Sequence, residues 1–164
     1  QKEDFYLVSR TKRPPLDKIN AMLSYLYTIM TSTYASALES VGLDSCYGFY
    51  HALRSGRSSL ACDLVEETRC VIERLVLTLI NLKKIHAKDF EIQESGSVFL
   101  TKEGKKKVLK AWQEKRRSMI LHPFLKEKFH LDCCHIFKVL CLQSISAVNF
   151  QSTPVFCRNS EKCF

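Results

Sequence analysis

The sequence is poor in the residues that interrupt a packed fold, with five Gly and four Pro among 164 residues. It also lacks an apolar run near the roughly 18 residues that span a bilayer. The best candidate, 71–82, is broken by Glu73 and Arg74. Because 46% of the residues are hydrophobic, collagen-like, low-complexity and disordered chains are excluded. We expect one domain with a proper core and no membrane partner.

A starting methionine and paired cysteine motifs are missing as well. The chain begins with Gln1 and has no basic, apolar signal segment, so we expect that it was processed or is part of something longer. Its eight cysteines form no paired CxxC spacing, which argues against a zinc ribbon. Since the chain is large enough to fold without covalent staples, reduced thiols in a cytoplasmic protein are the preferred interpretation.

Acidic residues are outnumbered, with 17 Asp and Glu against 25 Lys and Arg, which leaves a net charge of +8. This balance favours an acidic partner, although a basic surface that only keeps the protein in solution is equally compatible. The positive charge is concentrated between residues 102 and 128. There, Lys102, Lys106 and Lys110 share one i, i+4 stripe of a predicted helix. The stripe predicts a surface that follows a phosphate backbone, with a solvated helix face as the alternative.

The spacing of apolar residues predicts a mainly α fold with one small β-hairpin. Helices are expected over about 18–40, 59–82, 102–119 and 133–147. Asp17 and Thr101 stand where N-caps of the first and third helices are needed. Alternating apolar residues on either side of Gly96 predict the hairpin near residues 89–101.

One group of residues could support metal chemistry. His51 lies on the connection between the first two helices, and the second helix opens with Asp63 and Glu66. These two carboxylates are spaced i, i+3, so they share a helix face over which the loop can fold His51. An imidazole with carboxylates suits Mn²⁺ or Mg²⁺, which stabilise displacement at phosphorus. The flanking arginines that could hold phosphates are Arg54, Arg57 and Arg69.

A purely structural interpretation of the same residues stays open. Carboxylates in the first turns of a helix are common because they complement the helix dipole. A single histidine on a loop usually has no ligand to bind. The spacing of His51, Asp63 and Glu66 therefore does not by itself establish a metal site.

Several motifs in a fixed order resemble the CRISPR-associated integrase family, Cas one. Residues 13–25, RPPLDKINAMLSY, resemble its RPPxDxxNAxLS signature. Residues 42–51, GLDSCYGFYH, resemble its GLDP…GFLH segment, and residues 57–69, RSSLACDLVEETR, resemble its GRxSLAxDLxEExR segment. The likeness covers about residues 5–130 and is closest to the forms found in subtype I-C systems.

The resemblance implies a metal-dependent DNA endonuclease and integrase that inserts spacers into a CRISPR array. It implies His51 and Glu66 as metal ligands, Asp63 as a further catalytic carboxylate, and Mg²⁺ or Mn²⁺ as the cofactor. The implied partners are double-stranded DNA, a second copy of the chain and the small Cas two protein, in the cytoplasm. The expected DNA contacts are Arg13, Arg57, Arg69, Lys102, Lys106 and Lys110, with Tyr27 and Asn20 as supporting residues.

The sequence departs from the family at both ends. The family's first metal-binding Glu, in a GxEG-like segment, and its N-terminal β domain do not precede Arg13. We therefore expect residues 1–132 to be the helical catalytic portion of a longer protein, weak or inactive alone. Residues 133–164 are expected to be a divergent, Cys-rich segment. The alternative from a different functional class is a non-enzymatic basic helical module that binds DNA or a partner.

Overall fold

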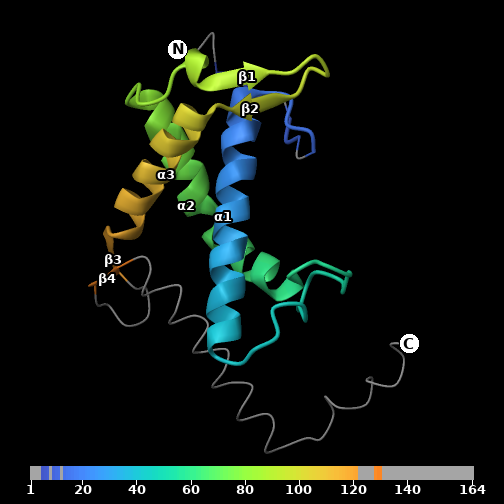
Figure 1. The fold of residues 1–164 in the computed structure, drawn as a ribbon. Helices are drawn as coiled ribbons and strands as arrows, with labels where there is room; N and C mark the ends of the chain where they lie inside the picture. Colours follow the sequence, from blue (N-terminus) through green and yellow to red (C-terminus); the bar gives the residue numbers. More distant parts are fainter. Residues whose placement is uncertain (1–4, 8, 12, 122–127, 131–164) are drawn as a thin grey trace, which may run out of the picture.

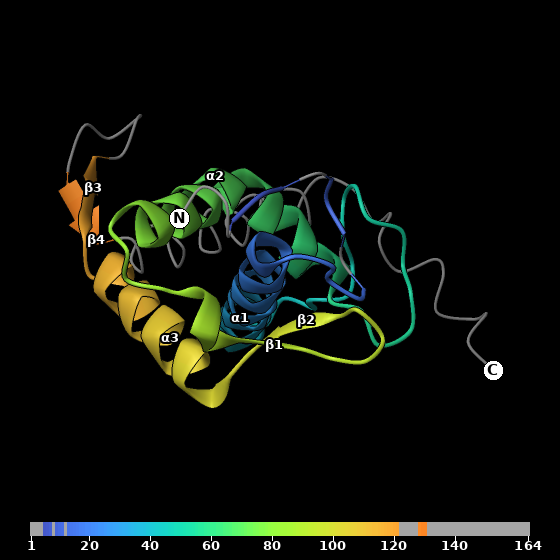
Figure 2. The ribbon, with the colours of Figure 1, turned by 90° about the horizontal axis from the view of Figure 1, so that it is seen from above.

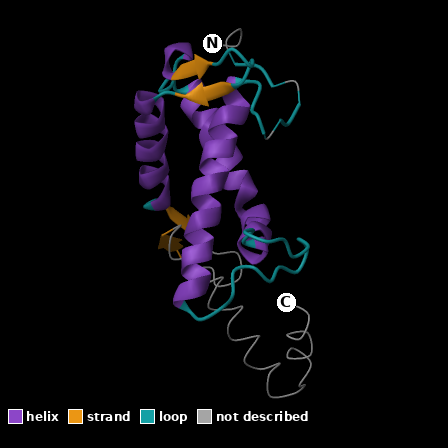
Figure 3. Ribbon diagram, turned by 45° about the vertical axis from the view of Figure 1, so that its right-hand side comes forward, coloured by secondary structure: helices purple, strands orange, loops and turns teal. Residues whose placement is uncertain are grey.

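Three helices and a β-hairpin make up most of the computed structural model, which describes residues 5–7, 9–11, 13–121 and 128–130 (Figure 1). The helices are α1 (Lys18–Ser40), α2 (Ser59–Asn81) and α3 (Lys102–Arg116), with a short 3-10 turn η1 (Ala87–Asp89). The strands are β1 (Phe90–Ile92), β2 (Val98–Leu100), β3 (Met119–Leu121) and β4 (Lys128–His130). The predicted mainly α fold with a hairpin is confirmed (Figure 3).

Helix α1 is the centre of the core. Its N-cap is Asp17, whose Oδ1 accepts the N–H of Asn20 at 2.7 Å and satisfies a free donor of the first turn. Every fourth residue along one face is an apolar side chain with at most 1% exposure: Met22, Leu26, Met30, Tyr34 and Leu38. Helix α2 packs against α1 and runs back in roughly the opposite direction (Figure 1). Each such buried Leu or Met contributes roughly 1.5–3 kcal/mol through loss of water contact.

The hairpin closes the end of the molecule where α1 begins. Strands β1 and β2 pair antiparallel, with Phe90 opposite Leu100. In a view along α1, helix α2 lies on one side of α1 and the hairpin on the other (Figure 2). The hairpin is attached to the segment before α1 because the N–H of Val98 donates to the carbonyl of Pro15 at 2.9 Å.

Helix α3 is attached to the hairpin through Asp89. The buried Asp89 carboxylate lies 2.6 Å from Lys107 Nζ and accepts the N–H of His86 at 2.9 Å. Burial raises the pKa of Asp89, but the Lys107 ammonium and the His86 N–H outweigh it, so the pKa lies below the ordinary value. The N-cap of α3 is Thr101, as predicted, with its Oγ1 accepting the N–H of Gly104 at 3.0 Å.

The predicted extension of the third helix to residue 119 is wrong. Helix α3 ends at Arg116, and β3 begins at Met119 and pairs antiparallel with β4. The apolar face of α3 ends at Trp112, which is 1% exposed. Residues 113–118 contain no apolar side chain, so burial in the core gives no support for extending the helix beyond Arg116. This second strand pair was not predicted.

The structure bears on three further features named in the sequence: a fourth helix, membrane-spanning helices and the cysteines. The helix predicted over 133–147 lies outside the described residues. Within the described ranges, no helix is long and apolar enough to cross a membrane. Among the described residues, Cys46, Cys62 and Cys70 are free thiols; the other five cysteines lie outside the described residues.

Gly104 supplies a test of the junction between α3 and the hairpin. A Cβ at this position would collide with the Asp89 carbonyl oxygen and lie 3.2 Å from Leu100 Cδ2. Helix propensity alone favours Ala over Gly by about 1 kcal/mol. We nevertheless expect Gly104→Ala to lower the free energy of unfolding by roughly 1–3 kcal/mol, measured by urea denaturation, because overpacking against backbone cannot relax cheaply. Lys106→Ala, on the exposed face of α3, is the control; a Gly104→Ala variant as stable as the parent would contradict this packing.

Candidate functional site

The Asp63 carboxylate fastens the loop between α1 and α2 onto the start of α2. Asp63 Oδ2 accepts the N–H of Phe49 at 2.5 Å and that of Tyr50 at 3.0 Å. Asp63 Oδ1 accepts the N–H of His51 at 3.2 Å and lies 2.5 Å from its ring Nδ1. The close approach depends on Gly48, where a Cβ would stand 2.7 Å from Asp63 Oδ2. The prediction that the loop folds His51 back over this helix face is confirmed.

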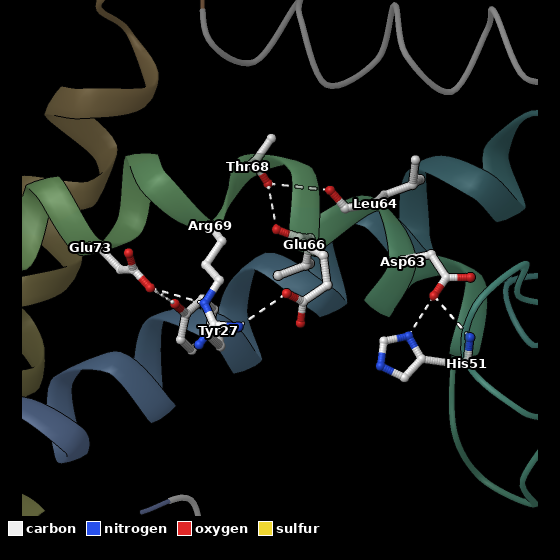
Figure 4. A network of polar contacts seen from close by, with 9 residues as sticks. Tyr27, His51, Asp63, Leu64, Glu66, Thr68, Arg69 and Glu73 are labelled. Atoms are coloured by element: carbon white, nitrogen blue, oxygen red, sulfur yellow. Dashed lines mark hydrogen bonds and ion pairs between the residues drawn. The ribbon is translucent and has the colours of Figure 1, made fainter. Parts of the chain in front are cut away.

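The contact with Asp63 decides which nitrogen of His51 is available. Because Nδ1 is engaged by the carboxylate, Nε2 is the ring nitrogen left for a metal ion or a proton (Figure 4). A carboxylate behind a metal-binding histidine fixes its tautomer and ring orientation. Burial raises the pKa of Asp63, but the Tyr50 N–H, the His51 ring and the Phe49 N–H bring it below the ordinary value. Asp63 is therefore ionised at neutral pH and can support His51.

Glu66 follows one turn after Asp63 and is held differently. Its side chain is 53% exposed and accepts a bond from Arg69 Nη1 at 3.1 Å. The same guanidinium donates from Nε to Glu73 at 2.9 Å, and these two carboxylates raise the pKa of Arg69. His51, Glu66, Arg69 and Glu73 all lie on the same side of α2, whereas Thr68 points the other way (Figure 4).

Tyr27 of α1 lies under this row of side chains. Its hydroxyl donates to Glu73 Oε1 at 3.2 Å, and the Arg69 guanidinium lies 5.6 Å from its ring centroid. Burial, with the nearby Glu73, raises the pKa of Tyr27 to about 12. The phenol therefore stays protonated and remains a hydrogen-bond donor at neutral pH. The expected supporting role of Tyr27 gains a physical basis in these contacts.

Two residues of this network, Arg10 and Glu73, were missed by the sequence analysis. Arg10 lies with its guanidinium 5.5 Å from the Tyr27 ring centroid and donates to Asn20 Oδ1 at 2.6 Å. Glu73 could have been found from its i, i+7 spacing to Glu66, which returns to the same helix face. Arg10 had no such signal, because only the fold brings its segment to α1.

The predicted DNA contacts are not gathered around His51. Lys102, Lys106 and Lys110 are all exposed on α3, which lies beside α2 and the hairpin. Arg57 is partly buried and belongs to the loop between α1 and α2. This loop lies away from the hairpin, toward the opposite end of α1 (Figure 1). Arg13 and Lys105 line one groove of about 500 Å³ between α1 and β2. Arg69, predicted to hold phosphate, instead binds two carboxylates.

Asn20 has a structural environment. Its side chain is fully buried and donates to the Ser9 carbonyl at 2.8 Å and to Asp17 Oδ2 at 2.5 Å, while accepting from Arg10. It therefore joins the N-terminal segment to the first turn of α1. Asn20 is connected to the site through Arg10, which it binds and which in turn contacts the Tyr27 ring.

The donor set on α2 is incomplete for a metal. No group of three His, Cys, Asp or Glu side chains able to hold a metal occurs in the described part of the chain. Both oxygens of Asp63 accept hydrogen bonds from the loop. The groups of this site that remain as possible metal ligands are His51 Nε2 and the Glu66 carboxylate. One nitrogen and carboxylate oxygens fit Mn²⁺ or Mg²⁺ rather than a metal that prefers thiolates. Further ligands must come from another carboxylate, water or substrate oxygens.

Comparison with known proteins decides the family. The family described as "CRISPR associated protein Cas1" matches residues 1–114. The chain belongs to the Cas1 family. It is 52% identical over 125 residues to "CRISPR-associated endonuclease Cas1 2" of Rhodospirillum rubrum, covering 76% of this chain and 36% of that protein. It is 46% identical over 129 residues to "CRISPR-associated endonuclease Cas1" of Leptospira interrogans, covering 78% and 50%.

Solved structures agree with the Cas1 assignment. A Cas1 protein from Thermotoga maritima superposes with a TM-score of 0.78 at 27% identity, over 88% of this chain and 44% of that one. A "Casposase bound to integration product" gives a TM-score of 0.82 at 25% identity, over 91% and 44%. The chain thus spans less than half of either structure, and 36–50% of the two curated Cas1 relatives.

Replacing Asp63 tests the loop attachment through the pH dependence of stability. Because folding lowers the pKa of Asp63, its contribution is complete above the unfolded value of about 3.9 and is lost as pH falls through the lower folded value. We expect Asp63→Asn to lower the free energy of unfolding by roughly 2–4 kcal/mol at pH 7, since an amide cannot satisfy all these donors. The difference from the parent should shrink below pH 4 in urea titrations.

The control for Asp63→Asn is Asp44→Asn. Asp44 is exposed and caps only the N–H of Cys46, at 2.8 Å. We expect its substitution to cost less than about 1 kcal/mol at either pH. An equal loss for Asp63→Asn at pH 7 and pH 3 would show that the charge of Asp63 is not what holds the loop.

Proposed function

We propose that this chain supplies the catalytic helical part of a metal-dependent DNA endonuclease and integrase that inserts new spacers into a CRISPR array. The observation that carries the proposal is the contact of His51 Nδ1 with Asp63, which leaves Nε2 free on the side of α2 where Glu66 lies. Membership of the Cas1 family supports it, as do the relatives named endonucleases. The structural neighbour bound to an integration product supports a DNA substrate.

In this proposal His51 Nε2 and the Glu66 carboxylate hold Mg²⁺ or Mn²⁺. An ion held by these residues would polarise the phosphodiester oxygens, which would favour attack of a DNA 3′-hydroxyl on phosphorus with release of the 3′-oxygen of the attacked strand as its hydroxyl. In this proposal Asp63 is a supporting residue and not the further catalytic carboxylate that the family resemblance implied. Its oxygens orient His51 and hold the loop, so it acts behind the ligands. A further carboxylate, of the kind the family has in a GxEG-like segment, completes the ligand set.

The exposed lysines of α3 serve as a second DNA contact, remote from the metal ligands. Lys102, Lys106 and Lys110 lie on one exposed stripe, suited to the spacing of phosphates rather than to one reacting group. Arg13, which lines a groove with Lys105, and Arg57, on the loop between α1 and α2, are proposed as further and separate DNA contacts. Arg69 is left out of this surface because Glu66 and Glu73 neutralise it.

The partners and the subtype are part of the same proposal. One structural neighbour is a "Cas6-RT-Cas1–Cas2 complex", with a TM-score of 0.76 and 26% identity over 90% of this chain and 16% of that chain. This neighbour supports Cas2 as a partner. The second copy of the chain stays a prediction from the family resemblance. The subtype I-C affinity and the boundary after residue 132 remain predictions from the motifs.

Alanine substitutions of the two proposed ligands test the chemistry. We expect His51→Ala and Glu66→Ala each to reduce Mn²⁺-dependent strand transfer by the complete protein by about 100-fold or more, because one ligand is lost. DNA binding without metal should change less than twofold. Glu114→Ala, which removes an exposed helix carboxylate from α3, is the control. Strand transfer that survives both substitutions would refute the assignment of this site.

The salt dependence of DNA binding tests the lysine stripe and the non-enzymatic alternative together. Replacing Lys102, Lys106 and Lys110 with Ala should lower the slope of log Kd against log salt by about 2–3, since each phosphate contact contributes roughly 0.9. The same three positions changed to Arg should retain the slope. An unchanged slope in the Ala variant would mean that these lysines only face solvent. If the slope falls but His51→Ala has no effect on any metal-dependent reaction, the non-enzymatic module is correct.

A further inference from the structure

We propose that Glu73 is a positioning residue that sets the direction of the Glu66 carboxylate through Arg69, with the Tyr27 ring against Arg69 and Arg10 against the same ring. The inference rests on the proposed function, because it takes Glu66 to be a metal ligand. It adds two residues, Glu73 and Arg10, that stand outside the motifs of the sequence. The juxtaposition on which it depends is the row of side chains along one side of α2 (Figure 4).

The first step is the double contact of Arg69. Its Nη1 donates to Glu66 Oε2 at 3.1 Å, and its Nε donates to Glu73 Oε1 at 2.9 Å. Because the guanidinium is a rigid plane, fixing its Nε edge on Glu73 also fixes where Nη1 points. Glu73 therefore determines where Arg69 Nη1 lies, and so where the Glu66 carboxylate is bound.

The second step is the support beneath the guanidinium. Tyr27 donates its hydroxyl to the Glu73 oxygen that Arg69 also uses, at 3.2 Å, and its ring lies under the Arg69 guanidinium. Arg10 lies over the same ring and is anchored by Asn20 Oδ1 and by the Thr11 carbonyl at 2.7 Å. A continuous series of contacts thus joins the segment before α1 to the Glu66 carboxylate.

The third step is the need for such a device. Glu66 is 53% exposed, and a glutamate side chain in that setting rotates freely unless a partner holds it. A single exposed ion pair holds little, but a guanidinium shared between two carboxylates and stacked on a ring restricts all its members. Positioning of this kind shows in the affinity for a metal, and its loss typically weakens metal binding or activity about ten- to hundredfold.

A competing role for Arg69 is direct contact with DNA phosphate, as its position in the sequence motif suggested. In that case, removing Glu73 would release the guanidinium and strengthen DNA binding. In the positioning role, removing Glu73 weakens metal binding and leaves metal-free DNA binding unchanged. Removal of Glu73 therefore separates the two roles: it strengthens metal-free DNA binding in one and weakens metal binding in the other.

The experiment measures Mn²⁺ binding to the complete protein directly, by the electron paramagnetic resonance signal of free Mn²⁺, alongside strand transfer at increasing Mn²⁺ concentration. We expect Glu73→Ala to raise the Kd for Mn²⁺ about ten- to hundredfold. At saturating Mn²⁺ the rate of strand transfer should recover to within about threefold of the parent. Glu73→Gln, which keeps an acceptor oxygen for Arg69 and Tyr27, should restore most of the affinity.

Matched variants separate positioning from general damage to the fold. Glu114→Ala removes the same charge from an exposed site on α3 and should leave the Kd for Mn²⁺ unchanged. Arg69→Lys keeps the charge but loses the rigid fork, so it should resemble Glu73→Ala. Tyr27→Phe keeps the ring and loses the hydroxyl, and should give a smaller increase of Kd. Thermal denaturation of every variant shows whether the fold is intact.

The outcomes distinguish this inference from the proposed function. If His51→Ala abolishes Mn²⁺ binding while Glu73→Ala leaves it unchanged or makes it tighter, Glu73 is not a positioning residue although the metal site stands. Stronger metal-free DNA binding by Glu73→Ala would also overturn the inference and return Arg69 to the DNA surface. If His51→Ala and Glu66→Ala leave Mn²⁺ binding intact, the metal site itself is wrong and the inference falls with it.

Discussion

The carboxylate of Asp63 is the constraint on which the candidate site depends. Buried at the start of α2, it gathers three backbone N–H groups and one imidazole nitrogen from a loop that has no regular structure of its own. A loop with unpaired N–H groups is costly to bury, and one ionised carboxylate satisfies three of them at once. His51 acquires its orientation from this arrangement.

The rest of the fold packs the apolar face of α2 against α1 and leaves its polar face available for the candidate site. The apolar face of α1 holds α2 in place, and the polar face of α2 then stands free for Glu66, Arg69 and Glu73. Near the hairpin, Asp89 holds α3 in place through Lys107, and Lys102, Lys106 and Lys110 of the same helix are exposed. The molecule thereby separates a small polar site from a broad basic surface. In the proposed function, the basic surface would bind the DNA backbone while the polar site would act at one phosphate.

Much of the fold was predictable because its signals are local. Asp17 and Thr101 are N-caps whose partners lie three residues away, and the bounds of α1 and α2 follow from apolar spacing. The end of α3 was predicted too late because residues 113–118 contain no apolar side chain, so apolar spacing gives no local signal for where the helix stops. The pairing of β3 with β4 joins segments that show no alternation strong enough to be recognised.

The sequence by itself determined the family motifs, the helices and the three residues His51, Asp63 and Glu66, since each rests on residue type and short spacing. Only the tertiary structure decided how those three divide their work. Which carboxylate is buried and which ring nitrogen is engaged depend on the contacts of Asp63 with His51, 12 positions away, and the support of Glu73 depends on Tyr27, 46 positions away. Hydrogen-bond geometry at such separations is set by packing of whole helices, and no local pattern encodes it.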